Sequence, residues 1–404
     1  MRPGTLSRQA LIGGLRRSWT FQALTFSANV NARPFTVLDH QYLGEAQETA
    51  IEPRTWVRSP LIQRSFTMIR SLHFRCLAFF LLAVLGLLPA RADDIASARE
   101  NLQLVIADLY AGEADDAISR LRSSLLANPQ DAEAHNLLCR VYFEEERWDD
   151  SIHECESAVQ LATQNSEYHL WLGQAYGGKA ENIHSIKAYA LAKEVRAEFE
   201  RAVQLDGRNP NALADLGEFY ADAPRIVGGG KQKAQDVARE LEQIDPVEAY
   251  ELKARLAEKD KNYALAETQF KAAVKASREP AEAWMTLASF YSRRHQTGLM
   301  LQAVHAGIDA DAKAREPHGT ALVHGAELLS QNNNEPELAI HLLNLYLDSP
   351  SKSPDLPAFR VHAALSRLLQ QQGDYFGARK QIEAAKALAS AYHPGSIRIT
   401  EMEQ

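Results

Sequence analysis

A short glycine-rich segment has residue types that could bind a phosphate group. Gly228-Gly229-Gly230-Lys231 has the composition of a loop whose backbone amides surround a nucleotide phosphate ahead of a helix. Such a loop needs a glycine five residues before its Gly-Lys pair and a Ser or Thr after the lysine. This sequence has Arg225 and Gln232 at those positions. We therefore interpret the segment as a widened turn between two helices.

The other chemically capable residues lack the spacing of a reactive site. The sequence contains 13 histidines, yet none forms an H-E-x-x-H pair, and Cys139 and Cys155 have no C-x-x-C partner. No Gly-x-Ser-x-Gly nucleophile motif occurs either. We predict no catalytic residue, no metal site and no cofactor, and hence no enzyme. The weaker alternative is an enzyme with a site in the insertions at 177–189 or 223–231.

A 34-residue period organises most of the chain. Leu172-Gly173 and Tyr176 repeat the pattern of Leu138, Cys139 and Tyr142 after 34 residues. Further copies of the pattern combine small residues with a large apolar residue at helical spacing. These copies are Gly217 with Tyr220, Phe199 with Ala202, Ala254 with Ala266 and Phe270, Ala288 with Tyr291, and Ser366 with Ala378, Ile382 and Ala385. A 34-residue period predicts two antiparallel helices per unit.

This pattern resembles the tetratricopeptide repeat family over roughly residues 98–392. The resemblance implies an all-α fold, a right-handed α-solenoid of about eight stacked antiparallel helix pairs. Small residues such as Gly173, Gly217, Ala254 and Ala266 let two helices approach closely, and the large residues fill the space between pairs. One helix pair cannot bury its own apolar face, so the units must stack.

The N-terminal region predicts an exported protein. Residues 1–67 contain eight arginines and no lysine, and we expect them to be disordered or to lie upstream of the true translation start. Residues 68–92 combine a basic start at Met68–Arg75, an apolar run from Cys76 to Leu88 and an Ala90-Arg91-Ala92 cleavage site, as a signal peptide does. Retaining the apolar run as an anchor is the alternative, although a membrane span needs about 20 residues.

The remaining chain divides into three parts. We assign residues 93–348 to the repeat solenoid, 349–357 to a linker rich in Pro and Ser, and 358–404 to a final helix pair and tail. Of the 44 basic and 52 acidic residues, eleven and four precede Asp93, which leaves a formal charge of −15 on residues 93–404. Nucleic acid and anionic lipid favour positive surfaces, so we expect neither as a partner.

The resemblance also places candidate binding residues. First helices of this family line a concave groove, which implies groove positions for Asn136, Arg140, Phe143, Glu218, Glu251, Arg255, Glu258, Ser289 and Arg293. Cys139 and Cys155 would lie on the two helices of one unit, where export would permit a disulfide. Two buried free thiols are the alternative, because the Cα atoms could be more than about 7 Å apart.

These features predict a periplasmic or secreted scaffold, released by cleavage near Ala92. It would bind a protein or peptide in its concave groove, in cell-envelope assembly or secretion. The alternative from the same residues is a membrane-tethered repeat protein that acts as an assembly factor.

Overall fold

The computed structural model describes residues 101–183, 186–314, 319–350 and 352–393. All of them belong to one of the two compact units into which the chain divides. The expected signal peptide, its cleavage site and the upstream residues 1–67 lie outside the described residues, as does the tail from residue 394. Within the described residues the secondary structure is helical, apart from an isolated bridge between Ser353 and Leu356.

The helices follow one another through short turns. A first helix covers residues 101–111. It is followed by α2 (Ala114–Ala127), α3 (Ala132–Glu144), α4 (Trp148–Leu161), α5 (Ser166–Glu181), α6 (Ile186–Leu205), α7 (Pro210–Asp222), the 3-10 helix η2 (Arg225–Val227), α8 (Lys231–Leu241), α9 (Pro246–Lys259), α10 (Tyr263–Ala276), α11 (Ala281–Arg293), α12 (Thr297–Asp311), α13 (Thr320–Gln331), α14 (Pro336–Asp348), α15 (Ala358–Gln371) and α16 (Tyr375–Leu388).

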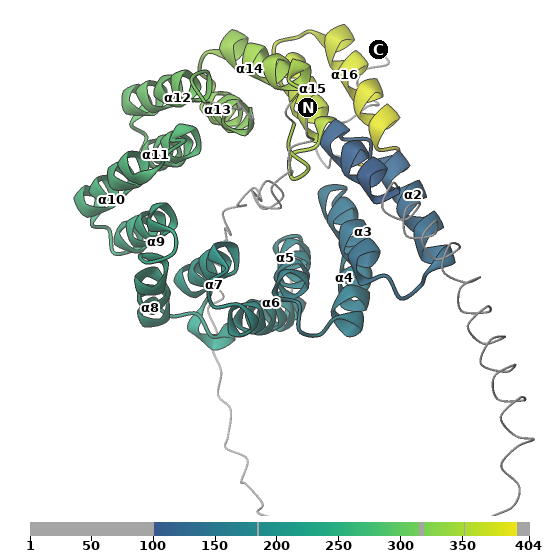
Figure 1. Ribbon diagram of the computed structural model, residues 1–404. Coiled ribbons are helices and arrows are strands. Elements are labelled where there is room, and N and C mark those ends of the chain that lie inside the picture. Colours follow the sequence, from purple (N-terminus) through teal and green to yellow (C-terminus); the bar gives the residue numbers. More distant parts are fainter. Residues whose placement is uncertain (1–100, 184–185, 315–318, 351, 394–404) are drawn as a thin grey trace, which may run out of the picture. The chain divides into compact units, whose positions relative to one another are not determined.

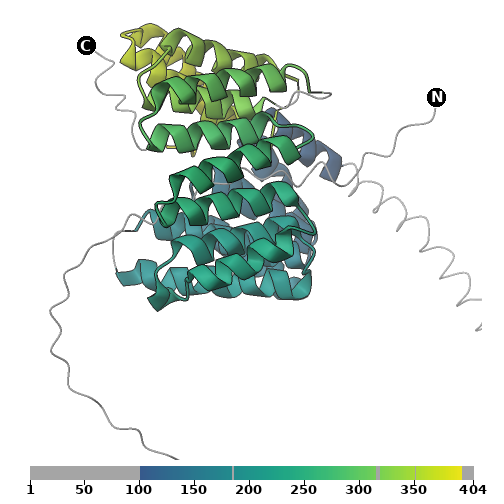
Figure 2. The same cartoon turned by 90° about the vertical axis from the view of Figure 1, so that its left-hand side faces the viewer.

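Consecutive helices form eight pairs within the described part of the chain, from the first helix with α2 to α15 with α16. The odd-numbered helices α3 to α15 lie on the inner side of the curved array, and the even-numbered helices lie outside them (Figure 1). Seen from the side, the helices from α8 to α14 stack in sequence order (Figure 2). The predicted all-α fold of stacked helix pairs is confirmed.

Several inner helices begin at an Asp or Asn side chain. The carboxylate of Asp131 accepts a hydrogen bond from the backbone N–H of Ala134, 3.1 Å away. Asn165, Asn209 and Asp245 cap α5, α7 and α9 in the same way. Each cap satisfies amide groups that the first helical turn leaves without a partner. The repeated caps fix where each inner helix starts, and therefore which of its residues face inward.

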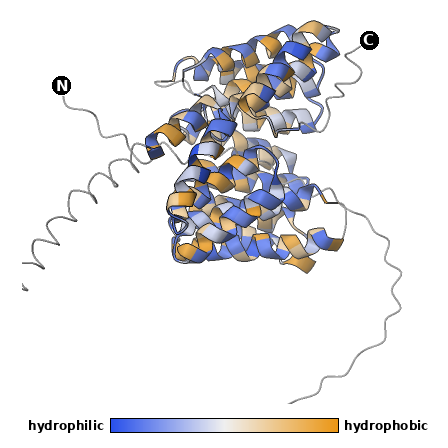
Figure 3. Cartoon of the chain, turned by 90° about the vertical axis from the view of Figure 1, so that its right-hand side faces the viewer, coloured by the Kyte–Doolittle hydropathy of each residue, from blue (hydrophilic) through white to orange (hydrophobic). Residues whose placement is uncertain are grey.

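The core lies between the inner and outer helices. Hydrophobic and hydrophilic residues alternate along the helices, as expected for elements buried on one side (Figure 3). At Gly173, a Cβ atom would lie 2.5 Å from the ring of Phe199, and at Gly217 it would lie 2.4 Å from Leu252. The small residues at these crossings therefore permit the close helix packing that the repeat pattern predicts.

Turns between paired helices repeat a left-handed backbone position. Gly112 and Glu146 lie 34 residues apart, as do Lys261 and His295, and all four have positive φ values between 57° and 79°. A positive φ is easily adopted by glycine, while a side chain makes it costly. Each of the three non-glycine residues therefore stores a small conformational strain.

Replacing exposed Lys261 with glycine is expected to stabilise the protein by about 0.5–1 kcal/mol, because it removes this strain at φ 59°. Urea unfolding followed by circular dichroism measures the effect. Gln302→Gly, at an exposed position inside α12, is the control and should destabilise by about the same amount. A destabilised Lys261→Gly variant would contradict the strain argument.

The insertion predicted at 177–189 is helical at residues 177–181 and 186–189. Gly177 and Gly178 lie inside α5, where a Cβ on Gly178 would be 2.3 Å from the ring of Trp148. Extra residues in this region lengthen α5 and α6, which have 16 and 20 residues. The 349–357 segment is folded against α14, since the buried Tyr346 hydroxyl donates to the Leu356 carbonyl at 2.5 Å and accepts from the Ser353 amide at 3.0 Å.

Candidate protein-binding surface

The inner face carries charged side chains that connect neighbouring helix pairs. Arg255 on α9 donates to Glu218 at 2.9 Å and to Asp222 at 3.3 Å, both on α7. Lys259 also pairs with Asp222 at 2.8 Å. Burial alone would lower the pKa of Arg255, but the carboxylates of Glu218 and Asp222 raise it above its ordinary value. The guanidinium is thus held in a fixed position between two inner helices.

A second connection joins α9 to α11. Glu258 accepts two hydrogen bonds from the Arg293 guanidinium, at 3.0 and 2.8 Å, and Arg293 also donates to Ser289 at 2.8 Å. The Arg293 side chain is 46% exposed. The structure therefore brings together three predicted groove residues in an arrangement that remains open to solvent.

Glu251 lies on α9, one helical turn before Arg255. It is partly exposed, and its charge contributes to the raised pKa of Arg255. Six predicted groove residues on α7, α9 and α11 are here called the inner charged stretch: Glu218, Glu251, Arg255, Glu258, Ser289 and Arg293. Glu218 is itself buried, so the expectation that it faces an open groove is corrected, and it contributes by holding Arg255. The ion pairs of this region contain more carboxylates than cations. Four acidic side chains lie beside three basic ones: Glu218, Asp222, Glu251 and Glu258 beside Arg255, Lys259 and Arg293.

A histidine contact joins α11 to α13 on the inner side. His324 lies 2.8 Å from Glu282 of α11. Burial would lower the pKa of His324, but the adjacent Glu282 carboxylate outweighs this and raises it to about 9. Asn332, directly after α13, donates a further hydrogen bond to the Ser292 hydroxyl of α11 at 2.8 Å. Adjacent inner helices are therefore linked by polar contacts rather than by apolar packing alone.

Three predicted groove residues on α3 have a different role. Asn136, Arg140 and Phe143 are buried. Phe143 packs edge-on against the rings of Trp148 and Trp171, with centroids 5.4 and 5.9 Å away. The expectation that these side chains face an open groove is corrected here, because all three are buried: aromatic rings cover Phe143, and Trp171 and Asp355 cover Arg140. Arg140 lies 4.5 Å from the Trp171 ring and 3.1 Å from Asp355.

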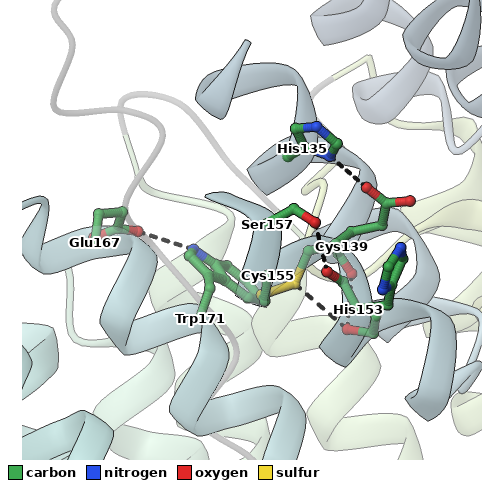
Figure 4. The surroundings of a disulfide bond; sticks show 9 residues. His135, Cys139, His153, Cys155, Ser157, Glu167 and Trp171 are labelled. Carbon is green, nitrogen blue, oxygen red and sulfur yellow. Dashed lines mark hydrogen bonds and ion pairs between the residues drawn. A yellow bond between two sulfur atoms is a disulfide. The ribbon is translucent and has the colours of Figure 1, made fainter. Parts of the chain in front are cut away.

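Cys139 and Cys155 form a disulfide between α3 and α4 (Figure 4). Their Cα atoms are 5.2 Å apart, and both residues are fully buried. The neighbouring Ser151 hydroxyl donates to the Cys139 carbonyl at 3.0 Å, which further fixes the helix crossing. The sequence leaves open a disulfide or two free thiols, and the structure has the disulfide.

The glycine-rich turn has its amides engaged internally. Gly228 and Gly229 donate to the carbonyls of Arg225 and Pro224, at 3.0 and 3.2 Å, and Gly230 donates to Tyr220 at 2.8 Å. A Cβ on Gly229 would lie 1.9 Å from the Ala223 carbonyl oxygen. These bonds make the segment a tight turn and direct its amides away from a phosphate, in agreement with its interpretation as a connection between helices.

Within the described residues, no group of three or more His, Cys, Asp or Glu side chains is placed to hold a metal ion. Nor does that part of the chain contain a helix long and apolar enough to cross a membrane.

Sequence reasoning missed the contacts that α3 makes with Trp171, Asp355 and Arg360. Arg360 donates to Glu144 at 2.7 Å, although the two residues are 216 positions apart. The 34-residue period describes contacts within a unit and between successive units. It contains no signal for contacts between the first and last units.

Comparisons with known proteins agree with the repeat architecture. Residues 108–176 match a tetratricopeptide repeat family model. Superkiller complex protein 3 of mouse is 26% identical over 215 residues, which are 52% of this chain and 13% of that protein. The human protein of the same name is 25% identical over 209 residues, 50% of this chain and 13% of that protein. The chain therefore matches about an eighth of the length of these curated relatives.

Similar solved structures include yeast Tom70, with 18% identity, coverage of 75% of this chain and 63% of that one, and a TM-score of 0.47. A tetratricopeptide repeat protein of Thermus thermophilus has 18% identity, coverage of 48% and 97%, and a TM-score of 0.41. The helix pairs and their 34-residue period agree with the match at 108–176 to a tetratricopeptide repeat model, and together they support a tetratricopeptide-type repeat architecture.

Proposed function

We propose that this chain is an exported, non-catalytic scaffold that holds a protein or peptide partner on its inner charged stretch, in cell-envelope assembly or secretion. The single observation that carries the proposal is this stretch of Glu218, Glu251, Arg255, Glu258, Ser289 and Arg293 on three successive inner helices. Rigid polar groups repeated along a solenoid suit recognition of an extended polypeptide.

The charge of the stretch favours a partner with basic groups. Its carboxylates exceed its cations, and residues 93–404 carry a formal charge of −15. A basic or neutral segment avoids the repulsion that an acidic partner would meet, and charge complementarity increases the association rate. The name of the mouse and human relatives refers to a complex, which is compatible with a role in binding other proteins.

Export is supported by the N-terminal sequence and by the disulfide. Cys76–Leu88 and the Ala90-Arg91-Ala92 site have the pattern of a cleaved signal peptide. Disulfides such as Cys139–Cys155 persist mainly in oxidising compartments. N-terminal sequencing of the protein from its native cells tests this part. A chain that starts near Asp93 would support export, whereas an intact Cys76–Leu88 run would favour the membrane-tethered alternative.

The binding proposal is tested by exchanging charges within one ion pair. The double variant Glu258→Arg/Arg293→Glu keeps a pair between α9 and α11 and inverts the pattern that a partner meets. An affinity-tagged protein is used to isolate partners from solubilised cell envelopes, and recovery of each partner is quantified. We expect recovery of a stoichiometric partner to fall at least about tenfold, which corresponds to about 1.4 kcal/mol.

The matched control exchanges an outer pair, Arg379→Glu/Glu383→Arg on α16, where both side chains are exposed. Partner recovery should be unchanged in this variant. Equal loss in both variants would indicate general charge sensitivity, and equal recovery in both would exclude the inner charged stretch as the binding surface.

A further inference from the structure

The two ends of the helix array meet. In Figure 1, α16 lies beside α2 near the start of the described chain. Phe359 of α15 contacts Tyr392, with ring centroids 4.9 Å apart. Both belong to the same apolar cluster as Val105, Leu138 and Tyr142 of the first two pairs. The contact surface between 101–146 and 352–392 is called the seam below.

Backbone packing brings the two sides of the seam very close. Gly112 has a φ of 79°, and a Cβ at this position would lie 2.5 Å from the Ala358 backbone nitrogen. The amide of Ser390 donates to the Asp115 carboxylate at 3.0 Å. The positive φ favours glycine at residue 112, and the close contact with the Ala358 backbone requires it.

Two ion pairs cross the seam. Arg360 donates to Glu144 at 2.7 Å and lies 3.8 Å from Glu146. Arg140 donates to Asp355 at 3.1 Å, and this pair is largely enclosed, with side chains 11% and 8% exposed. Buried pairs must offset the cost of removing two charges from water, so they specify a position more strongly than they stabilise it.

The seam differs from the junctions between consecutive pairs because noncovalent contacts alone hold its two sides together. No backbone connection crosses it, whereas the chain itself links consecutive pairs, so the two sides can separate without breaking a covalent bond. Burial raises the pKa of the Asp355 carboxyl group despite the opposing effect of Arg140, which reflects a cost of enclosing its charge. A cavity of about 20 Å³, room for about one water molecule, lies between residues of both sides.

We propose that the seam is a reversible latch. When it opens, the α15–α16 pair separates from the first helices, Arg360 leaves Glu144, and the curvature of the inner face relaxes through small changes at each repeat. Opening and closing then give the inner face two geometries, and a partner that binds one of them better shifts the equilibrium towards it. The effect on a partner rests on the proposed function, whereas the latch itself does not.

The latch is tested by measuring the distance across the seam in the full chain without any partner. Nitroxide labels are attached to Ser119→Cys on α2 and Lys380→Cys on α16, which are exposed positions, and Cys76→Ser removes the other thiol outside the disulfide. Double electron–electron resonance then gives the distance distribution. In the otherwise unchanged protein we expect one main short distance.

Arg360→Glu places like charges beside Glu144 and Glu146 and should increase the open population at least tenfold. The open form adds distances longer by about 10 Å or more, the spacing of one helix layer. The exchanged double variant Glu144→Arg/Arg360→Glu restores opposite charges and should recover the short distance. Arg293→Glu breaks an ion pair of similar type away from the seam, and should leave the distribution unchanged.

Circular dichroism confirms that each variant keeps its helix content, so that opening is distinguished from unfolding. An unchanged distribution in folded Arg360→Glu, or equal lengthening in Arg293→Glu, would overturn the latch. Neither result would bear on whether the inner charged stretch binds a partner.

Discussion

Replacing Phe199 with alanine is expected to lower the free energy of unfolding by about 3–5 kcal/mol, the range for deleting a buried aromatic side chain. Phe199 is fully buried on α6 and fills the space beside Gly173 of α5. Its removal leaves a cavity at the crossing of a helix pair, and the stacked neighbours restrict how far the helices can collapse into it. Urea unfolding followed by circular dichroism measures the loss.

Phe376→Ala is the matched control, because the same chemical change is made at a side chain that is 83% exposed on α16. Its effect should stay within about 0.5 kcal/mol. If the two alanine variants lost similar stability, the packing of α5 against α6 would be wrong.

Removal of the disulfide is expected to have the second largest effect. The Cys139→Ala/Cys155→Ala variant should lose about 3 kcal/mol, because the bond closes a loop with a sequence separation of 16 and restricts the unfolded chain. Both cysteines are fully buried, so alanine also loses some apolar contact. The thermal midpoint, measured with and without dithiothreitol, reports the loss.

Reductant provides the internal control for this prediction. Dithiothreitol should lower the midpoint of the protein with both cysteines and leave that of the double alanine variant unchanged. A midpoint that is insensitive to reductant in both proteins, together with complete reduction shown by thiol labelling, would contradict a stabilising bond.

The 34-residue period allowed the fold to be predicted from the sequence. Gly173 and Gly217 recur at the positions where a helix pair needs small residues, and the structure places Phe199 and Leu252 directly against them. The turn at 223–231 could also be interpreted correctly, since Arg225 and Gln232 do not match a phosphate-binding loop. Contacts of this kind depend on residues that are near in sequence or one period apart.

The candidate site was less predictable, because its geometry depends on contacts across many repeats. Arg255, Glu258 and Arg293 could be assigned to inner helices by their position in the repeat. Arg140 has an equivalent position, yet it is covered because Asp355, 215 positions away, folds onto it. The period also could not decide the state of Cys139 and Cys155, since a small rotation of either helix changes their separation by more than the tolerance of a disulfide.

Site-specific photocrosslinking tests most directly the central claim that a protein partner binds the inner face. A benzophenone amino acid replaces either Ser289, at the inner charged stretch on α11, or Thr268, exposed on α10 of the outer row. The protein is irradiated in its native cells, and crosslinked chains are identified by mass spectrometry. We predict one dominant partner crosslinked from position 289 and little from position 268. The same partner crosslinked mainly from position 268, or equally from both positions, would contradict binding on the inner face.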